Sequence, residues 1–281
     1  MLGTIALDID GTITAEHHAL SKPVVDYFMA LKQAGWRFIF ITGRTFSWGN
    51  DVLQFLPFDY YVAVQNGAII LHMPSKRIVS KKYIDRSVFP IMDQICQNEP
   101  TDYVLYTGFE YGDVCYYRPQ HFSKELLVYV EHRKKTLKET WFPVESYEGV
   151  HQQSFPSLKC IGSYETIARI AQKIDKELGL HVPIIKDPFN PNYYVAQATH
   201  ANIDKGQALR DLLSLNGQGL PVIAAGDDNN DKSMLAAADY RVVMATAPEE
   251  MKLGADIIAP PATEDGIIQG LDEAIAKIGK R

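Results

Sequence analysis

Cysteine is scarce in this sequence. Only three cysteines occur, Cys96, Cys115 and Cys160, and they are widely spaced without a CxxC pair. An odd set of this kind argues against a disulfide framework and against a cysteine-based zinc site. We therefore expect the three thiols to be small buried apolar groups.

Long apolar runs and a surplus of basic residues are also missing. No stretch of about eighteen apolar residues occurs, and the first residues do not join a basic patch to an apolar segment. The formal net charge of -6 disfavours nucleic acid and anionic membranes as partners, because both bind basic surfaces. These absences predict a cytoplasmic protein. An anionic substrate would need a site made locally positive by a metal ion and a few cations.

The composition that remains is that of an ordinary globular chain. Hydrophobic residues make up 46% and charged residues 22% of the 281 residues, so a sizeable core is expected. The length favours about two domains.

The first apolar run, Ile5–Leu7, ends in a polar segment that contains Asp8, Asp10, Gly11 and Thr12. Ligands of open parallel sheets bind at the carboxyl ends of the strands, so a strand ending at Asp8 predicts a ligand site. Two acids separated by one residue, next to a glycine, suit a carboxylate nucleophile and a proton donor. Taken alone, the segment fits a turn or a helix cap equally well.

A helix over residues 21–35 and an apolar strand over 38–41 come next, which makes a strand, helix, strand unit. The second strand ends at Thr42, followed by Gly43 and Arg44. The Thr42 hydroxyl should therefore lie near Asp8 if the two strands are neighbours.

A third strand is expected over residues 61–64, and another extended segment over 68–71. The Asn66-Gly67 step between them is typical of a hairpin turn. The sequence therefore favours a turn role for Asn66 at least as much as contact with a ligand.

The pattern changes near residue 82. From there, pairs of aromatic strand-like segments alternate with helical ones, which is typical of an α+β module and not of a continued parallel sheet. The strand-like segments are 103–106, 114–117, 158–161 and 182–185, and the helical segments are 88–96, 125–137 and 166–178. We predict a core domain formed by residues 1–82 and 191–281, with a second domain inserted over 83–190.

Two polar clusters follow in the second part of the predicted core. Lys205 opens a helix, and an apolar strand over 221–225 precedes an acidic run that contains Asp227, Asn230 and Asp231. A lysine at a helix start usually projects into solvent, and Asp231 fits a helix cap. Because Lys205 would oppose the helix dipole there, an anion or a carboxylate partner is the more plausible interpretation.

Three strands thus end at Asp8, Thr42 and Asp227. The carboxylates of Asp8 and Asp227, with a backbone carbonyl near Asp10, would provide the hard oxygen ligands that Mg²⁺ prefers. The Thr42 hydroxyl and the Lys205 ammonium group would serve an anion. The assembled residues predict a site for a phosphoryl group.

The polar segments also carry a likeness to a known family. The motif DxDGT at 8–12, Thr-Gly-Arg at 42–44, Asp-Lys-Gly at 204–206 and Gly-Asp-Asp-Asn-Asn-Asp at 226–231 resemble, in that order, the motifs of the haloacid dehalogenase superfamily. The insertion resembles the type IIB cap of Cof-like sugar phosphatases. This resemblance implies an α/β fold with a Rossmann-like parallel-sheet core and an inserted α+β cap domain.

The resemblance further implies a role for each acid and for the lysine. Asp8 would attack phosphorus to form an aspartyl-phosphate, while Asp10 would protonate the leaving oxygen and later activate water. Lys205 would neutralise the nucleophile and the phosphate. Mg²⁺ would be bound at Asp8, Asp10 and Asp227, with Asp231 as a further ligand or a supporting residue.

A second implied group contacts the phosphate or the substrate. Its members are Gly11, Thr12, Thr42, Gly43, Arg44 and Asn230. The resemblance thus indicates a Mg²⁺-dependent phosphatase for a small phosphorylated metabolite, such as a sugar phosphate.

Three alternatives remain open at this point. A phosphomutase of the same superfamily would use the same nucleophile, and a non-catalytic protein would bind the phosphate ligand without turnover. A signalling receiver domain also uses an acceptor aspartate with Mg²⁺ and lysine, but it is much shorter than this chain. The oligomeric state is not encoded in any motif.

Overall fold

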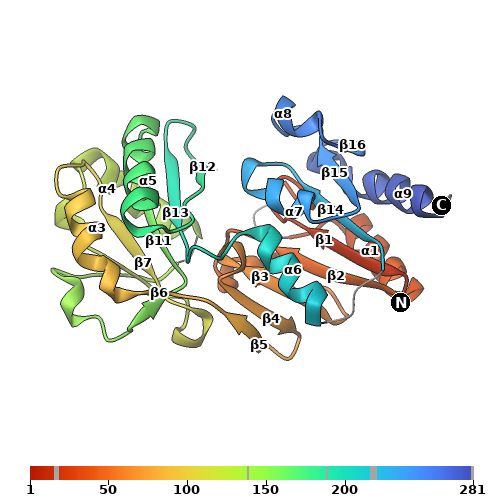
Figure 1. Ribbon diagram of the computed structural model, residues 1–281, viewed down its shortest axis with the longest axis horizontal. Helices are drawn as coiled ribbons and strands as arrows, with labels where there is room; N and C mark the ends of the chain where they lie inside the picture. The colour runs from red at the N-terminus through yellow and green to blue at the C-terminus, as the bar shows by residue number, and fades with distance from the viewer. Residues whose placement is uncertain (16–18, 138, 188, 216–219, 280–281) are drawn as a thin grey trace. The chain divides into compact units, whose positions relative to one another are not determined.

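The structure is a computed structural model that describes residues 1–15, 19–137, 139–187, 189–215 and 220–279 (Figure 1). The chain divides into two compact units. The first unit comprises Met1–Arg44, Trp48–Lys81 and Asp204–Arg281, and the second comprises Thr45–Ser47 and Lys82–Ile203.

The first unit is built on an eight-stranded sheet with the order β16-β15-β14-β1-β2-β3-β4-β5. The strands from β16 to β3 run parallel, and β4 and β5 are antiparallel additions at one edge. The strands are β1 (Gly3–Leu7), β2 (Trp36–Ile41), β3 (Tyr60–Val64), β4 (Ile69–Met73), β5 (Arg77–Lys81), β14 (Val222–Gly226), β15 (Tyr240–Met244) and β16 (Ile257–Ala259).

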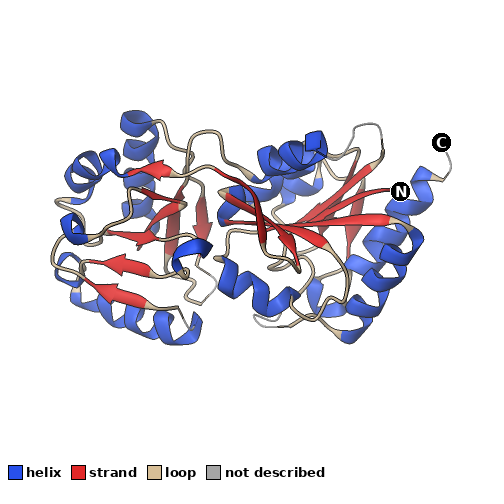
Figure 2. Ribbon diagram, turned by 90° about the horizontal axis from the view of Figure 1, so that it is seen from below, coloured by secondary structure: helices blue, strands red, loops and turns tan. Residues whose placement is uncertain are grey.

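Helices lie on both faces of this sheet (Figure 2). On one face α1 and α9 contact each other, and on the other α6 contacts α7. The helices of the unit are α1 (Lys22–Ala34), α2 (Phe46–Leu53, of which Trp48–Leu53 belong to this unit), α6 (Lys205–Leu215), α7 (Lys232–Ala236), α8 (Glu249–Lys252) and α9 (Ile267–Ile278).

Helix α1 shows how local sequence places these helices. The Ser21 hydroxyl accepts a hydrogen bond from the Val24 amide at 3.3 Å, which caps the helix start. Gly35 ends the helix in the left-handed region at φ 105°. Between these caps, Phe28 packs against Phe38 of β2 with ring centroids 5.0 Å apart. The expected helix over 21–35 is therefore confirmed.

The second unit has a six-stranded sheet with the order β12-β13-β11-β7-β8-β9, antiparallel except where β8 pairs with β9. A separate pair is formed by β6 and β10. Its elements are β6 (Ile84–Asp85), α3 (Phe89–Cys96), β7 (Tyr103–Tyr106), β8 (Cys115–Tyr117), α4 (Lys124–Leu137), β9 (Trp141–Pro143), β10 (Ser154–Phe155), β11 (Ser157–Gly162), α5 (Tyr164–Leu178), β12 (Ile184–Lys186) and β13 (Tyr194–Ala198).

The predicted fold class is confirmed, and the end of the second unit differs from the predicted boundary. We expected the chain to return to the core domain at residue 191. Instead, β13 pairs with β11 and β12, so the second unit continues to Ile203. The sequence of β13 is a short apolar strand that fits either sheet, and only its pairing partners decide between them.

Two expectations from the composition can be compared with the structure. The cysteines Cys96, Cys115 and Cys160 are free and buried, as expected. Across the described part of the chain, none of the helices combines the length and the apolar character that crossing a membrane requires.

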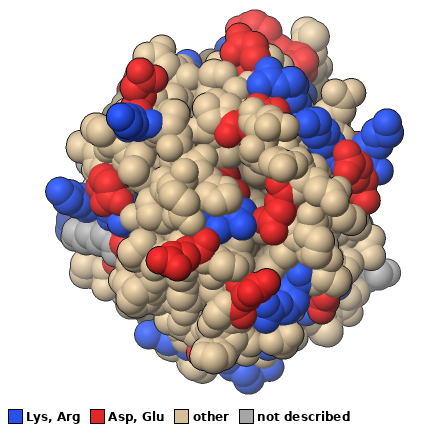
Figure 3. Space-filling view, turned by 90° about the vertical axis from the view of Figure 1, so that its left-hand side faces the viewer, with Lys and Arg blue, Asp and Glu red and all other residues tan. Residues whose placement is uncertain are grey.

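On the face of the second unit seen in Figure 3, basic and acidic side chains are interspersed among uncharged ones.

Candidate active site

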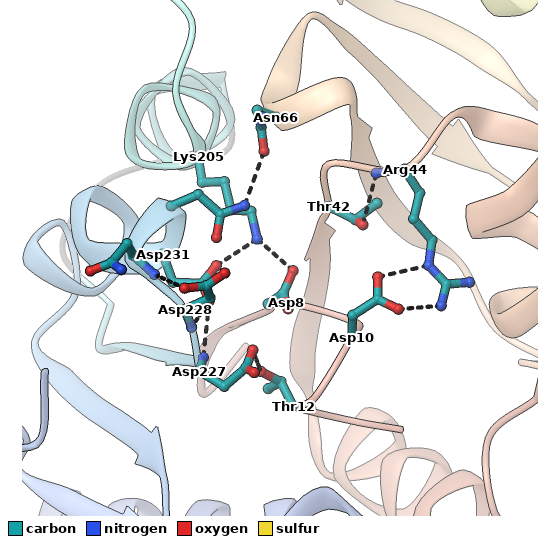
Figure 4. Close-up of polar contacts among 12 residues, drawn as sticks. Asp8, Asp10, Thr12, Thr42, Arg44, Asn66, Lys205, Asp227, Asp228 and Asp231 are labelled. Carbon is teal, nitrogen blue, oxygen red and sulfur yellow. Dashed lines mark hydrogen bonds and ion pairs between the residues drawn. The ribbon is translucent and has the colours of Figure 1, made fainter. Parts of the chain in front are cut away.

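The carboxyl ends of four neighbouring parallel strands bring the predicted residues together. In the order β14-β1-β2-β3, Leu7 is in register with Ala225 on one side and with Phe40 on the other. Asp8 and Asp227 therefore follow adjacent strands at the same edge, and Thr42 follows the next one (Figure 4). The ends of the three strands therefore lie together, as the sequence predicted.

Lys205 lies at the centre of the site, and its side chain is 2% exposed. Its Nζ donates to Asp8 Oδ1 at 2.5 Å and to Asp231 Oδ1 at 2.5 Å. Asp204 precedes it and accepts from the Gln207 amide at 2.7 Å, which caps the start of α6. The lysine is thus directed into the protein by its carboxylate partners and does not project into solvent.

Asp231 has a positioning role as well as a charge. Its Oδ2 accepts hydrogen bonds from the amides of Asp227 and Asp228, at 2.9 and 3.0 Å. Together with the Lys205 contact, these bonds engage both carboxylate oxygens. The sequence prediction of a helix cap or a metal ligand is thus refined, because Asp231 closes the loop after β14 and holds the lysine.

The turn after β1 leaves no room for a side chain at Gly11. Gly11 has φ 71°, and a Cβ there would lie 2.2 Å from Asp227 Oδ2. The next residue, Thr12, is fully buried and its hydroxyl donates to Asp227 Oδ1 at 3.2 Å. Both residues, for which phosphate contact was predicted, lie against Asp227, and the Thr12 hydroxyl holds its carboxylate.

Gly11→Ala is expected to distort the site by displacing Asp227. The matched control is Gly179→Ala, where φ is 60° but a Cβ would meet nothing within 4 Å. The control measures the cost of a left-handed alanine, roughly 1 kcal/mol. Gly11→Ala should lose more than the control in a chemical unfolding titration and should also weaken binding of a divalent cation. Equal losses in the two variants would show that the Asp227 contact is unimportant.

Burial and crowding alter the protonation of the acids. Desolvation, with the Asp231 charge as the next cause and Lys205 opposing, raises the pKa of Asp8 to about 8. The pKa of Asp227 is likewise raised well above its usual range by burial and by the charge on Asp8. For Lys205, the charges on Asp231 and Asp8 outweigh desolvation and raise the pKa. The site thus has more buried acid than one lysine can neutralise.

This surplus of acid fits a divalent cation. One ligand oxygen from each of Asp8, Asp227 and Asp231 lies within 4.8 Å of the others. Carboxylate oxygens at this spacing are the hard ligands that Mg²⁺ and Ca²⁺ take. Asp10, also expected near the metal, directs its side chain elsewhere, so its backbone carbonyl is the group that remains available.

The Asp10 carboxylate is held by Arg44. The Arg44 guanidinium donates from Nε to Oδ2 at 2.8 Å and from Nη2 to Oδ1 at 2.5 Å, a two-bond geometry that fixes the carboxylate. Arg44 also lies over the Trp48 ring at 4.1 Å and is 1% exposed, while Asp10 is 43% exposed. The side chain of Arg44, for which substrate contact was predicted, is thus buried and positions Asp10.

The residues after β2 and β3 complete the site. Thr42 is buried, and its hydroxyl accepts from the Arg44 amide at 3.1 Å, with Gly43 between them. Asn230 donates from Nδ2 to Asn66 Oδ1 at 3.5 Å. The sequence favoured a turn role for Asn66 at least as much as contact with a ligand. The signal for the site was its place just after a third apolar strand, which the structure shows to be parallel to β2.

An aspartate pair, a buried lysine and a threonine hydroxyl thus lie together at the carboxyl edge of a Rossmann-like sheet. The chain belongs to the haloacid dehalogenase-like hydrolase family, whose model matches residues 5–271. The superfamily predicted from the four motifs, and the prediction of a hydrolase, are therefore confirmed.

Related proteins share nearly the whole length of the chain. Phosphatase YwpJ of Bacillus subtilis is 26% identical over 94% of this chain and 96% of its own. The pyridoxal phosphate phosphatase YbhA of Escherichia coli is 23% identical over 94% and 96%. Among solved structures, the HAD subclass IIB sugar phosphatase BT4131 superposes with a TM-score of 0.75 at 19% identity, over 96% of this chain and 98% of that one.

Proposed function

We propose that the protein is a Mg²⁺-dependent phosphatase that hydrolyses a small phosphorylated metabolite, a sugar phosphate, through an aspartyl-phosphate on Asp8. The observation that carries this proposal is the buried Lys205, which joins Asp8 to Asp231 within the group of three acids. Relatives named as phosphatases over nearly full length support the same chemistry, and the likeness to a sugar phosphatase supports the substrate class.

In the first proposed step, an Asp8 carboxylate oxygen attacks phosphorus and the bond from phosphorus to the leaving oxygen breaks. Asp10 gives a proton to that oxygen. Lys205 remains against Asp8 and offsets the charge of the incoming phosphoryl oxygens. The Thr42 hydroxyl donates to one of these oxygens.

In the second step, Asp10 takes a proton from water, and the water oxygen attacks phosphorus. The bond from phosphorus to Asp8 breaks, which restores the carboxylate and releases phosphate. The two steps separate a difficult displacement into two easier ones. Arg44 keeps Asp10 in one orientation for both proton transfers.

Asp8, Asp227 and the backbone carbonyl near Asp10 would hold Mg²⁺, with Asp231 as their support. When bound, the ion supplies positive charge that stabilises the developing charge on the phosphoryl oxygens. The second unit is proposed to be the cap domain, which selects the leaving group and excludes water during the first step.

The test is phosphate release from a panel of sugar phosphates, pyridoxal phosphate, nucleotides and p-nitrophenyl phosphate, with Mg²⁺ and with EDTA. We expect release that requires the metal and is fastest with a sugar phosphate. Conversion of one sugar phosphate to an isomer with negligible free phosphate would instead identify a phosphomutase. Phosphate binding without turnover of any compound would identify a binding protein.

Affinity for Mg²⁺ is expected to fall as the pH is lowered from 8 to 6. Burial raises the pKa of Asp8 to about 8 and raises that of Asp227, so the metal must displace protons in this range. Each displaced proton weakens apparent affinity by about tenfold per pH unit. The metal-free protein should lose stability as the pH rises to about 8, because burial disfavours the ionised form of Asp8 and the charge on Asp231 adds to this effect. Calorimetric titration with Mg²⁺ at pH 6, 7 and 8 measures the affinity for the ion. An affinity that is the same at all three pH values would contradict the predicted fall.

A further inference from the structure

The loop between β3 and β4 has an unusual backbone. Its three residues, Gln65, Asn66 and Gly67, have φ values of 52°, 58° and 105°. Left-handed geometry is uncommon for a residue with a side chain, and here both Gln65 and Asn66 adopt it. Backbone outliers of this kind persist only where surrounding structure holds them, and they cluster at functional sites.

The surroundings of this loop are parts of the active site. The Asn66 amide donates to the Thr42 carbonyl at 2.8 Å, and the Gln65 amide donates to the Arg44 carbonyl at 2.8 Å. A Cβ at Gly67 would lie 2.6 Å from Ala208 Cβ, so the loop packs closely on α6, the helix that begins with Lys205. The position of Asn66 is therefore fixed relative to both Thr42 and Lys205.

The Asn66 side chain is 2% exposed. Its Oδ1 accepts from Asn230 Nδ2, but no described residue accepts a hydrogen bond from Asn66 Nδ2. Figure 4 shows Asn66 on the side of Asp8 where Lys205 and Thr42 lie, away from Asp227 and Thr12. A buried amide without an acceptor is rare, because a donor removed from water must be satisfied by another partner.

We propose that Asn66 Nδ2 donates a hydrogen bond to a non-bridging oxygen of the bound phosphoryl group, as a third donor beside Thr42 and Lys205. This inference rests on the proposed function and assigns a further substrate-binding residue to the same site. An amide N–H suits an anion and cannot coordinate a hard cation. The ligand oxygen supplies the acceptor that none of the described residues supplies.

A turn role alone does not account for these features. Aspartate and glycine also adopt the left-handed region readily, and aspartate would still accept the hydrogen bond from Asn230. Neither the left-handed turn nor the contact with Asn230 requires a buried amide donor at this position. Asn66→Asp therefore separates the two roles, because it keeps the turn and the Asn230 contact but replaces the donor with a negative charge.

The experiment compares Asn66→Asp and Asn66→Gly with the wild type in two measurements. The first is calorimetric binding of orthophosphate in the presence of Mg²⁺, and the second is kcat/KM for several phosphate monoesters. We expect Asn66→Asp to weaken orthophosphate binding and to lower kcat/KM by about 10- to 100-fold, with a smaller loss in Asn66→Gly. The loss in kcat/KM should be the same for every monoester, because all share the phosphoryl group.

The matched control is Lys76→Gly, since Lys76 is an exposed residue with φ 55° at the other end of β4. It should leave both measurements unchanged. An Asn66→Asp variant that equals the wild type would overturn the inference, as would a loss that depends on the leaving group with orthophosphate binding intact. If Asn66→Asp does not fold, Asn66→Gly decides: unchanged orthophosphate binding refutes the role, and weakened binding supports it.

These outcomes are distinct from failure of the proposed function. A wild-type protein with neither metal-dependent phosphate release nor orthophosphate binding would refute the phosphatase proposal itself. A wild type that is active, with Asn66 variants that are equally active, would refute only the role of Asn66.

Discussion

Asp8→Asn is expected to abolish turnover while leaving the fold intact. The amide has nearly the shape of the carboxylate but cannot attack phosphorus, so kcat should fall by roughly 10⁴-fold or more. The substitution also removes a buried carboxylate, whose pKa burial raises to about 8. The neutral amide does not carry the cost of burying a charge, so the folded state should be retained. Phosphate release from the best substrate of the panel, with thermal unfolding by circular dichroism, measures both effects.

The control for this variant is Asp26→Asn, on the exposed face of α1, where Asp26 pairs with Lys22. Its turnover should equal that of the wild type. Orthophosphate binding to Asp8→Asn in the presence of Mg²⁺ reports whether the rest of the site has survived. Turnover close to the wild-type value in Asp8→Asn would show that another group is the nucleophile.

Lys205→Met is expected to cause the largest loss of stability together with loss of activity. Methionine has a similar length but no charge, so it leaves the carboxylates of Asp8 and Asp231 buried without their shared partner. Breaking a buried ion pair by removing one partner costs about 3–5 kcal/mol. The loss should be greater at pH 8 than at pH 5, because burial raises the pKa of Asp8 to about 8 and its carboxylate can take up a proton at the lower pH.

Urea unfolding at both pH values, in EDTA, measures this effect. The matched control is Lys232→Met, since Lys232 is 49% exposed and pairs with the exposed Glu250. An exposed pair of this kind contributes less than about 1 kcal/mol. If the two lysine variants lost the same small amount of stability, the buried network would not have the energetic importance that its geometry suggests.

Local features of the sequence were sufficient to predict the elements that carry the site. Helix α1 begins after Ser21 and ends at Gly35, because a hydroxyl cap and a left-handed glycine act over only a few residues. The strands before Asp8, Thr42 and Asp227 were equally readable, since each is a short apolar run bounded by polar residues.

The sequence was less informative where a residue or a strand could contact either of two distant parts of the chain. Arg44 follows Thr42 and was expected at the substrate, yet it binds Asp10 and lies over Trp48. The strand β13 was expected to belong with the core and pairs instead in the sheet of the second unit. In both cases the residue type allows either outcome, and contacts with distant residues choose between them.

The sequence by itself therefore determined the fold class, the order of the motifs and the chemical groups available at each strand end. Only the tertiary structure decided which of these groups form hydrogen bonds and ion pairs with one another. Lys205 and Asp8 are 197 positions apart and meet because β1 lies between β14 and β2 in the sheet, and α6 packs against β2 and α7. Likewise, Asn66 is a buried donor and not a plain turn residue because its loop packs against α6. Caps and strands depend on neighbours in sequence, whereas burial and pKa depend on neighbours in space.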